Sequence, residues 1–98
     1  MWSGLTIAAL ACARTLYLKP NSNWTQANAR FAIYMFGNGD GWTDMTAVSG
    51  ETDLYQGTID DKYPKVIFCR MNPDTKENDW KNRWDQTNDL TLGSENMY

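Results

Sequence analysis

The aromatic residues are the side chains of this chain best suited to specific chemistry. Its 98 residues include five tryptophans and five tyrosines, and five tryptophans are unusually many for this length. Their flat rings lose little conformational entropy when they are buried, and they present a negative face to the weakly positive C–H groups of a sugar. Stacking against a sugar is therefore the binding chemistry that the composition favours.

Trp80 and Trp84 are four residues apart in a polar stretch. On a single helical turn, two residues at this spacing would share one face. Two interpretations are open. The indoles either anchor a loop to the rest of the domain, or they form a second aromatic patch that binds a sugar or another subunit.

Catalysis finds no support in the residue types. The chain has no histidine, which excludes Ser–His–Asp and Cys–His mechanisms and histidine-ligated metals. A glycosidase needs two carboxyl groups facing each other across a cleft. Asp60 and Asp61 are instead expected in a solvated turn. Asp85 and Asp89 lie on either side of Gln86 in the sequence, and their spacing does not indicate a catalytic pair. The chain is predicted not to be an enzyme.

No metal or cofactor is expected either. Asn38, Asp40 and Asp44 lie near glycines and offer oxygen atoms of the kind that calcium binds. The spacing of an EF-hand is missing, however, and turns use the same residues for conformational reasons. The two cysteines, Cys12 and Cys69, can form at most one disulfide, and two cysteines alone do not decide the redox compartment.

The charge balance is acidic. The chain contains nine lysine and arginine residues and twelve aspartate and glutamate residues, which gives a formal charge of −3 and a pI near 4.7. Such a domain lacks the basic footprint that attracts nucleic acid or an anionic membrane. Nucleic acid is therefore not expected among its partners.

Residues 1–14 form an apolar N-terminal segment. The uncharged run 5–12 leads into small residues, as the apolar part of a secretion signal does, but the first basic residue, Arg14, follows the run instead of preceding it. The run is also too short to span a bilayer. It is either an extra strand, which packs on this domain or on a neighbour, or the remnant of a secretion signal.

Residues 15–98 alternate short β-forming runs with turns and show no helix of any length. The polar residues 72–84 are expected to form a long loop or to carry a short helical turn. Glycine-rich turns are expected at 37–41 and 49–53. The expected strands are residues 15–19, 28–36, 42–48, 54–59, 65–71 and 90–92.

This succession of short strands predicts an all-β fold. Turn signals recur about every 8–12 residues, which is typical of a single antiparallel β-sandwich of the immunoglobulin-like kind with about six to eight short strands. The strand at 28–36 is apolar on both faces. It is therefore expected to be central, with a ligand, a partner or a second sheet on its outer side.

Several short blocks in this order resemble one protein family: LYLKP at 16–20, ARFAIY at 29–34, GWTDM at 41–45, KVIF at 65–68 and QTNDL at 86–90. Over about residues 15–92 the chain resembles the starch-binding carbohydrate-binding modules of families 25 and 26. These are small β-sandwich domains attached to secreted amylases. The block at 69–73 and the loop with Trp80 and Trp84 are additions to the family pattern.

The resemblance implies non-catalytic binding of α-glucans such as starch or malto-oligosaccharides on an aromatic platform. Carried over residue by residue, the platform would consist of Tyr34 and Trp42, assisted by the polar Gln86, with Trp80 and Trp84 as further candidates. The resemblance also implies a secreted protein, extracellular or associated with a surface. Residues 15–98 would then be a carbohydrate-binding-like domain.

The alternative function is structural. A β-sandwich with an uncharged N-terminal strand can complete the sheet of a neighbour by strand addition, as a fibre, virion or surface-layer subunit would. The apolar run at 5–12 and the tryptophan pair motivate this interpretation. The partners predicted for the chain are thus an α-glucan polysaccharide or further copies of itself.

Overall fold

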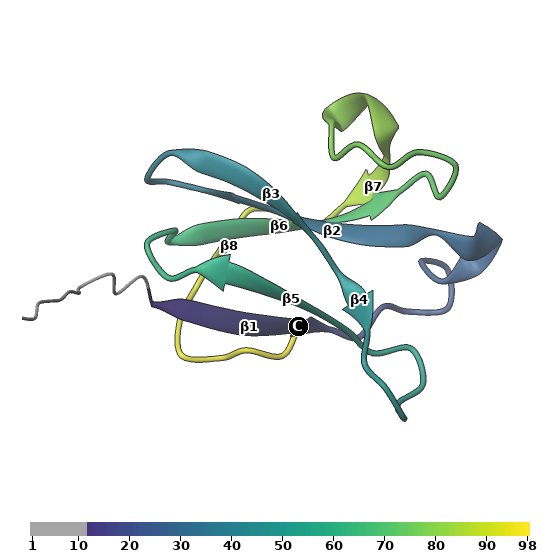
Figure 1. Ribbon diagram of the computed structural model, residues 1–98, viewed down its shortest axis with the longest axis horizontal. Helices are drawn as coiled ribbons and strands as arrows, with labels where there is room; N and C mark the ends of the chain where they lie inside the picture. Colours follow the sequence, from purple (N-terminus) through teal and green to yellow (C-terminus); the bar gives the residue numbers. More distant parts are fainter. Residues whose placement is uncertain (1–11) are drawn as a thin grey trace, which may run out of the picture.

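The described part of the chain, residues 12–98 of this computed structural model, forms two antiparallel sheets that pack against each other (Figure 1). One sheet has the strand order β1–β5–β4. The other has the order β3–β2–β6–β7, and β8 also pairs with β6. The predicted all-β sandwich of six to eight short strands is confirmed. The strands are β1 (Ala13–Leu18), β2 (Arg30–Phe36), β3 (Asp40–Asp44), β4 (Thr46–Ala47), β5 (Tyr55–Asp60), β6 (Lys65–Met71), β7 (Arg83–Gln86) and β8 (Leu90–Thr91).

The helical content of residues 12–98 is two single turns of 3-10 helix, η1 (Gln26–Asn28) and η2 (Trp80–Asn82). The short helical turn expected within 72–84 is therefore present as η2. Neither of these turns has the length needed to cross a bilayer. The strand expected from residue 28 begins at Arg30, because Ala27 and Asn28 have φ values of 58° and 54° and cannot continue a strand.

The single strand expected at 42–48 is wrong. This segment divides into β3 and β4, which belong to different sheets. Met45 lies between them, buried, and its N–H donates to the carbonyl of Phe31 at 3.0 Å. The chain bends across from one sheet to the other at this point, as strands at the corners of β-sandwiches do.

Strand β7 was not among the expected strands, because three of its four residues are polar and it follows a long polar loop. It pairs with β6 through Cys69 opposite Gln86 and Arg70 opposite Asp85, and the register shifts after Arg70. A strand at the edge of a sheet needs few apolar residues and is commonly charged. The neighbouring strand, rather than the local sequence pattern, therefore decides its conformation.

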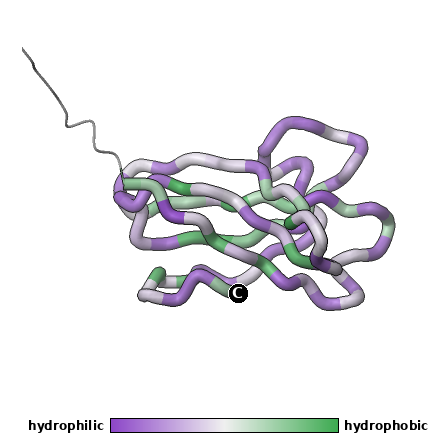
Figure 2. Tube along the Cα trace, turned by 60° about the horizontal axis from the view of Figure 1, so that its bottom comes forward, coloured by the Kyte–Doolittle hydropathy of each residue, from purple (hydrophilic) through white to green (hydrophobic). Residues whose placement is uncertain are grey.

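The main core lies between the two sheets and takes alternate residues from the facing strands. Figure 2 shows hydrophobic residues concentrated along the paired strands, while hydrophilic residues prevail in the loops. Each large side chain buried here contributes about 1.5–3 kcal/mol. The buried members of this core are Leu16, Leu18, Phe31, Ile33, Met35, Met45, Ile59, Val66 and Phe68.

A second apolar cluster lies on the outer face of the five-stranded sheet. As expected, β2 is central, between β3 and β6, and is apolar on both faces. The outer face is covered by aromatic side chains and by the loop at 72–82. The buried members of the outer cluster are Ala32, Ile67, Cys69 and Met71, with Tyr34, Phe36 and Trp42 packed against them.

Strand β1 is partly covered by the C-terminal segment. The Tyr17 N–H donates to the Asn96 carbonyl at 2.7 Å, and the Tyr98 N–H donates to the Tyr17 carbonyl at 2.8 Å. Strand β1 begins at Ala13, two residues before the strand that was expected from residue 15. Residues 1–11 lie outside the described residues, so the extra strand, the signal remnant and self-assembly through this segment stay predictions.

Both cysteines are free thiols, so the disulfide that the sequence permitted between Cys12 and Cys69 is absent. Cys12 is exposed next to β1 of the three-stranded sheet. Cys69 is buried on β6, in the outer cluster of the other sheet. Cys12 precedes a strand of one sheet and Cys69 lies on the outer face of the other sheet, so their sulfur atoms cannot approach to the roughly 2 Å of an S–S bond.

A thiol reagent is expected to label Cys12 in the folded protein and to spare Cys69. Burial raises the pKa of the Cys69 thiol to about 12, against an opposing influence of Arg83, so its reactive thiolate is both scarce and shielded. Mass spectrometry after iodoacetamide treatment should show one modification in native buffer and two in urea. Two modifications in native buffer, or none in urea without reductant, would contradict this assignment.

Candidate functional site

An aromatic pair, Tyr34 of β2 and Trp42 of β3, stands at the centre of the candidate site. The two residues lie directly opposite each other in the strand register, and their ring centroids are 5.1 Å apart with planes tilted by 56°. Each is four residues from Asn38, the middle of the turn between the strands. Gly37 and Gly39 on either side of Asn38 have φ values of 101° and 76°, which glycine adopts freely. The hairpin thus joins the two rings that the family resemblance singled out.

Trp80 adds a third ring from a distant part of the chain. Its centroid lies 4.9 Å from that of Tyr34 and 4.8 Å from that of Trp42. Trp80 is the first residue of η2. The preceding residue, Asp79, caps this turn, because its carboxylate accepts a hydrogen bond from the Lys81 N–H at 3.0 Å. Phe36 stacks on Tyr34 at 5.5 Å. We call Tyr34, Phe36, Trp42 and Trp80 the aromatic cluster.

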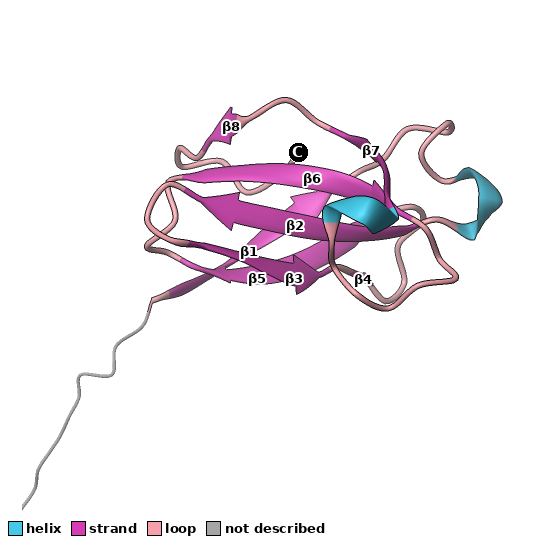
Figure 3. Ribbon diagram, turned by 90° about the horizontal axis from the view of Figure 1, so that it is seen from above, coloured by secondary structure: helices cyan, strands magenta, loops and turns pink. Residues whose placement is uncertain are grey.

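The aromatic cluster lies on the outer face of the five-stranded sheet, where η2 lies over β2 (Figure 3). Trp80 is 39% exposed, and the other three rings are half-buried. The contacts among Tyr34, Trp42 and Trp80 tilt the ring planes by 56–64° relative to one another. These three rings therefore form an angular surface, whereas the planes of Phe36 and Tyr34 differ by only 22°.

Asp40 provides a carboxylate next to these rings. The Tyr34 hydroxyl donates to Asp40 Oδ2 at 2.9 Å, and the Tyr63 hydroxyl donates to the Asp40 carbonyl at 3.3 Å. The hydrogen bond to Asp40 raises the pKa of Tyr34 above its ordinary value, and desolvation adds to this effect. Tyr34 is therefore a neutral donor with a defined orientation.

Gln86 and Arg83 of β7 add polar groups to the surroundings of the site. The Arg83 guanidinium donates to Gln86 Oε1 and lies over the Trp80 ring at 5.7 Å from its centroid. Gln86 pairs with Cys69 on β6 and is half-buried. Through Arg83, the predicted polar residue Gln86 is connected to Trp80.

Trp84 lies apart from the aromatic cluster. Its ring packs under the Arg70 guanidinium at 4.8 Å, and it is 43% exposed. Trp80 and Trp84 do not share a helical turn, because η2 ends at Asn82 and Trp84 belongs to β7. Of the two interpretations, anchoring of a loop suits Trp80, which packs on β2 and β3 while retaining an exposed surface.

Three residues of this region were not among the predicted sugar-binding residues: Phe36, Arg83 and Asp40, which the sequence analysis considered only for calcium. Phe36 and Asp40 face each other across the hairpin, so a register centred on Asn38 could have revealed both. No local sequence pattern indicated Arg83, because its contact with the Trp80 ring depends on how β7 pairs with β6. The signal for Phe36 was the alternation of β2, which sets it on the same face as Tyr34.

The oxygen-rich turn residues do not assemble a metal site. Asp40 is engaged by Tyr34, and Asp44 accepts a hydrogen bond from Asn78 at 2.8 Å. Within residues 12–98, no three acidic or cysteine side chains are grouped closely enough to share a metal ion.

The fold and the exposed rings define a β-sandwich with an aromatic surface on one sheet. Compared with protein-family models, with curated proteins and with solved structures, the chain gives no match.

Proposed function

We propose that this domain binds α-glucan chains, such as starch or malto-oligosaccharides, on the aromatic cluster and does so without catalysis. The observation that carries the proposal is the gathering of Tyr34, Trp42 and Trp80 within about 5 Å of one another on a solvent-facing sheet surface. Tyr34 and Trp42 are also the residues that the resemblance to starch-binding modules implies for the platform.

The tilt of the rings favours a curved ligand. A flat, ribbon-like glucan is best matched by coplanar rings, whereas the planes of Tyr34, Trp42 and Trp80 are turned by 56–64° from one another. The chain of an α-glucan turns from one sugar to the next, so its successive C–H faces can meet rings of different orientation. Each ring contact supplies apolar area together with a specific geometry.

Polar groups beside the rings suit the hydroxyl groups of a sugar. Asp40 and Gln86 offer oxygen acceptors, and Arg83 offers donors, all within the contacts described above. A small open surface of this kind gives weak binding per site. Repeated sites along a polysaccharide raise the overall affinity through multivalency. An extracellular or surface-associated location belongs to the same proposal.

A malto-oligosaccharide is expected to change the tryptophan fluorescence in a saturable manner. The exposed indole of Trp80 and the half-buried Trp42 would both lose contact with water when a sugar stacks on them. A titration with maltoheptaose, beside cellohexaose as the flat β-linked control, measures this. A response to both sugars would contradict the selectivity, and a response to neither would contradict the proposed function.

A further inference from the structure

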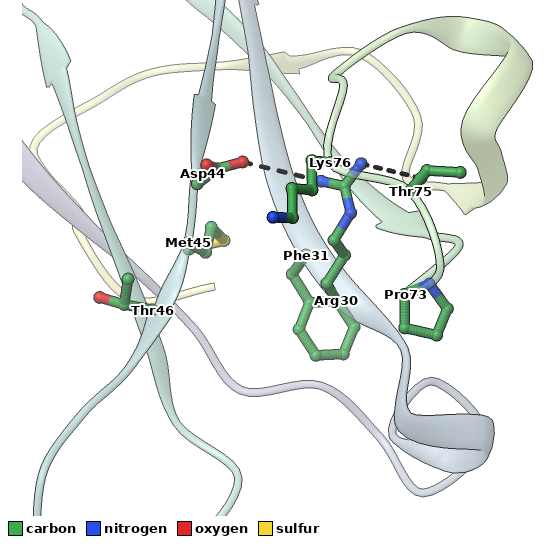
Figure 4. A pocket seen from close by; sticks show the side chains of 8 residues that line it. All are labelled: Arg30, Phe31, Asp44, Met45, Thr46, Pro73, Thr75 and Lys76. Carbon is green, nitrogen blue, oxygen red and sulfur yellow. Dashed lines mark hydrogen bonds and ion pairs between the residues drawn. The ribbon is translucent and has the colours of Figure 1, made fainter.

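Arg30, at the start of β2, is the centre of a hydrogen-bond network that holds the loop at 72–78. Figure 4 shows its guanidinium between Asp44 and Thr75. Its Nε donates to the Asn72 carbonyl at 3.2 Å, and its Nη1 donates to Asn78 Oδ1 at 2.7 Å. Its Nη2 donates to Thr75 Oγ1 at 3.2 Å and to the Glu77 carbonyl at 2.7 Å. One guanidinium thus holds four points of a single loop.

Asp44 of β3 fixes the orientation of this guanidinium. Its Oδ1 lies 3.7 Å from Arg30 Nη1 and accepts the side-chain amide of Asn78 at 2.8 Å. Arg30, Asp44 and Asn78 therefore form a closed triangle that joins β2, β3 and the loop. A planar fork of donors is needed for such simultaneous contacts, which a lysine cannot reproduce.

The held loop leads directly into η2. The Asn72 N–H donates to the Asn82 carbonyl at 2.8 Å, and the Asn82 side-chain amide donates to the Glu77 carbonyl at 3.1 Å. These bonds close the two ends of the segment 72–82 on each other. Fixing residues 72–78 therefore also fixes Trp80.

Apart from the contacts of the Trp80 ring, packing holds this loop weakly, since none of residues 72–82 is fully buried. Residues Trp80–Asn82 include no buried residue. Beside Arg30, an open hollow of about 390 Å³ separates the loop residues Pro73 and Lys76 from Thr46 on β4 (Figure 4). Because side chains leave this space unfilled, the hydrogen bonds of Arg30 attach the loop to β2.

We propose that Arg30 is a positioning residue for the aromatic cluster, because it holds the loop at 72–82 so that Trp80 stays against Tyr34 and Trp42. The inference rests on the proposed function where it concerns glucan binding. The placement of Trp80 can be tested without any ligand. The hydrogen bonds of Arg30 reach residues 72–78 and not the rings themselves, so its effect on binding passes through the loop.

The main test compares Arg30→Met with Arg14→Met. Arg14 is the matched control, since its guanidinium also ties a loop, through Asn96 Oδ1 and the carbonyls of Gly93 and Glu95, and this loop lies outside the segment 72–82. Asn78→Ala is the milder variant, because it removes two bonds of the network from a surface loop and leaves β2 intact. Full-length protein is used throughout.

Two readouts need no sugar. Far-UV circular dichroism reports the coupling of two tilted indoles in contact, here Trp42 and Trp80 at 4.8 Å and 62°. Limited trypsin digestion reports release of the loop, through cleavage after the exposed Lys76 and Lys81. Arg30→Met is expected to lose the indole coupling and to be cleaved faster in the loop than Arg14→Met, with Asn78→Ala intermediate.

The third readout is maltoheptaose affinity. Arg30→Met is expected to bind about tenfold more weakly, the equivalent of one displaced aromatic contact, while Arg14→Met binds as the unchanged protein does. Unchanged indole coupling and unchanged cleavage in Arg30→Met and Asn78→Ala would overturn the inference. Loss of coupling with full affinity would overturn its link to binding. If the unchanged protein binds no maltoheptaose, the proposed function fails, and the two sugar-free readouts still decide the role of Arg30.

Discussion

Replacing Trp42 with alanine is expected to weaken maltoheptaose binding roughly 30-fold, equivalent to about 2 kcal/mol, and to abolish retention on starch. Trp42 contacts both Tyr34 and Trp80, so the substitution removes one stacking surface and also the ring against which the other two are set. The domain should stay folded, because Trp42 is half-buried on β3, at the edge of its sheet. Electrophoresis through a starch gel and calorimetric titration measure the effect.

Trp84→Ala is the matched control for this substitution. Trp84 has the same side chain and a large exposed fraction of 43%, but its ring packs on Arg70 and not on the aromatic cluster. This variant should migrate in the starch gel as the unchanged protein does. Retention of Trp42→Ala, or an equal loss in both variants, would show that the aromatic cluster is not the site of binding.

Replacing Phe68 with alanine is expected to lower the free energy of unfolding by about 3–5 kcal/mol. Phe68 is 0% exposed, lies opposite Ile33 in the centre of the five-stranded sheet and packs against the ring of Tyr98 at 5.3 Å. Its removal leaves a cavity in the main core. Because a domain of this size has a total stability of about 5–15 kcal/mol, the variant should be largely unfolded at moderate urea concentrations.

Phe36→Ala tests whether position in the core, and not loss of a phenyl ring as such, causes this effect. Phe36 is half-buried on the outer face and stacks on Tyr34. Its replacement should cost less than half as much stability, as measured by urea denaturation followed by circular dichroism. Equal losses in the two variants would mean that the outer cluster contributes as much to stability as the core between the sheets.

The β-strands were predictable where they are buried on one or both faces. The run at 65–71 was expected with the bounds that β6 has, because its β-forming residues are flanked by turns. The division of 42–48 into β3 and β4 was not predictable, since Met45 is apolar like a strand residue and its bond to Phe31 joins positions far apart in sequence. Strand β7 escaped detection because its pairing with β6 is the main reason for its extended conformation.

The candidate site also has one part that was predictable from the sequence and one part that was not. Tyr34 and Trp42 lie on one hairpin, and the glycines of the turn between them are visible in the sequence, so their meeting is a local property. Trp80 reaches the same place from a loop whose attachment depends on Arg30, more than forty positions earlier. A pattern of spacings cannot report a contact that is made by hydrogen bonds between such distant segments.

The sequence by itself determined the all-β class, through short β-forming runs separated by glycine-rich turns, and it excluded histidine-based chemistry through composition. The tertiary structure alone decided which aromatic rings meet. It separated Trp84 from Trp80, left Cys12 exposed before β1 and Cys69 buried on β6, and brought Trp80 onto Tyr34 and Trp42. The physical reason is that strand conformation follows from neighbouring residues, whereas the packing of one face of a sheet follows from register, sheet order and the long-range bonds that hold its loops.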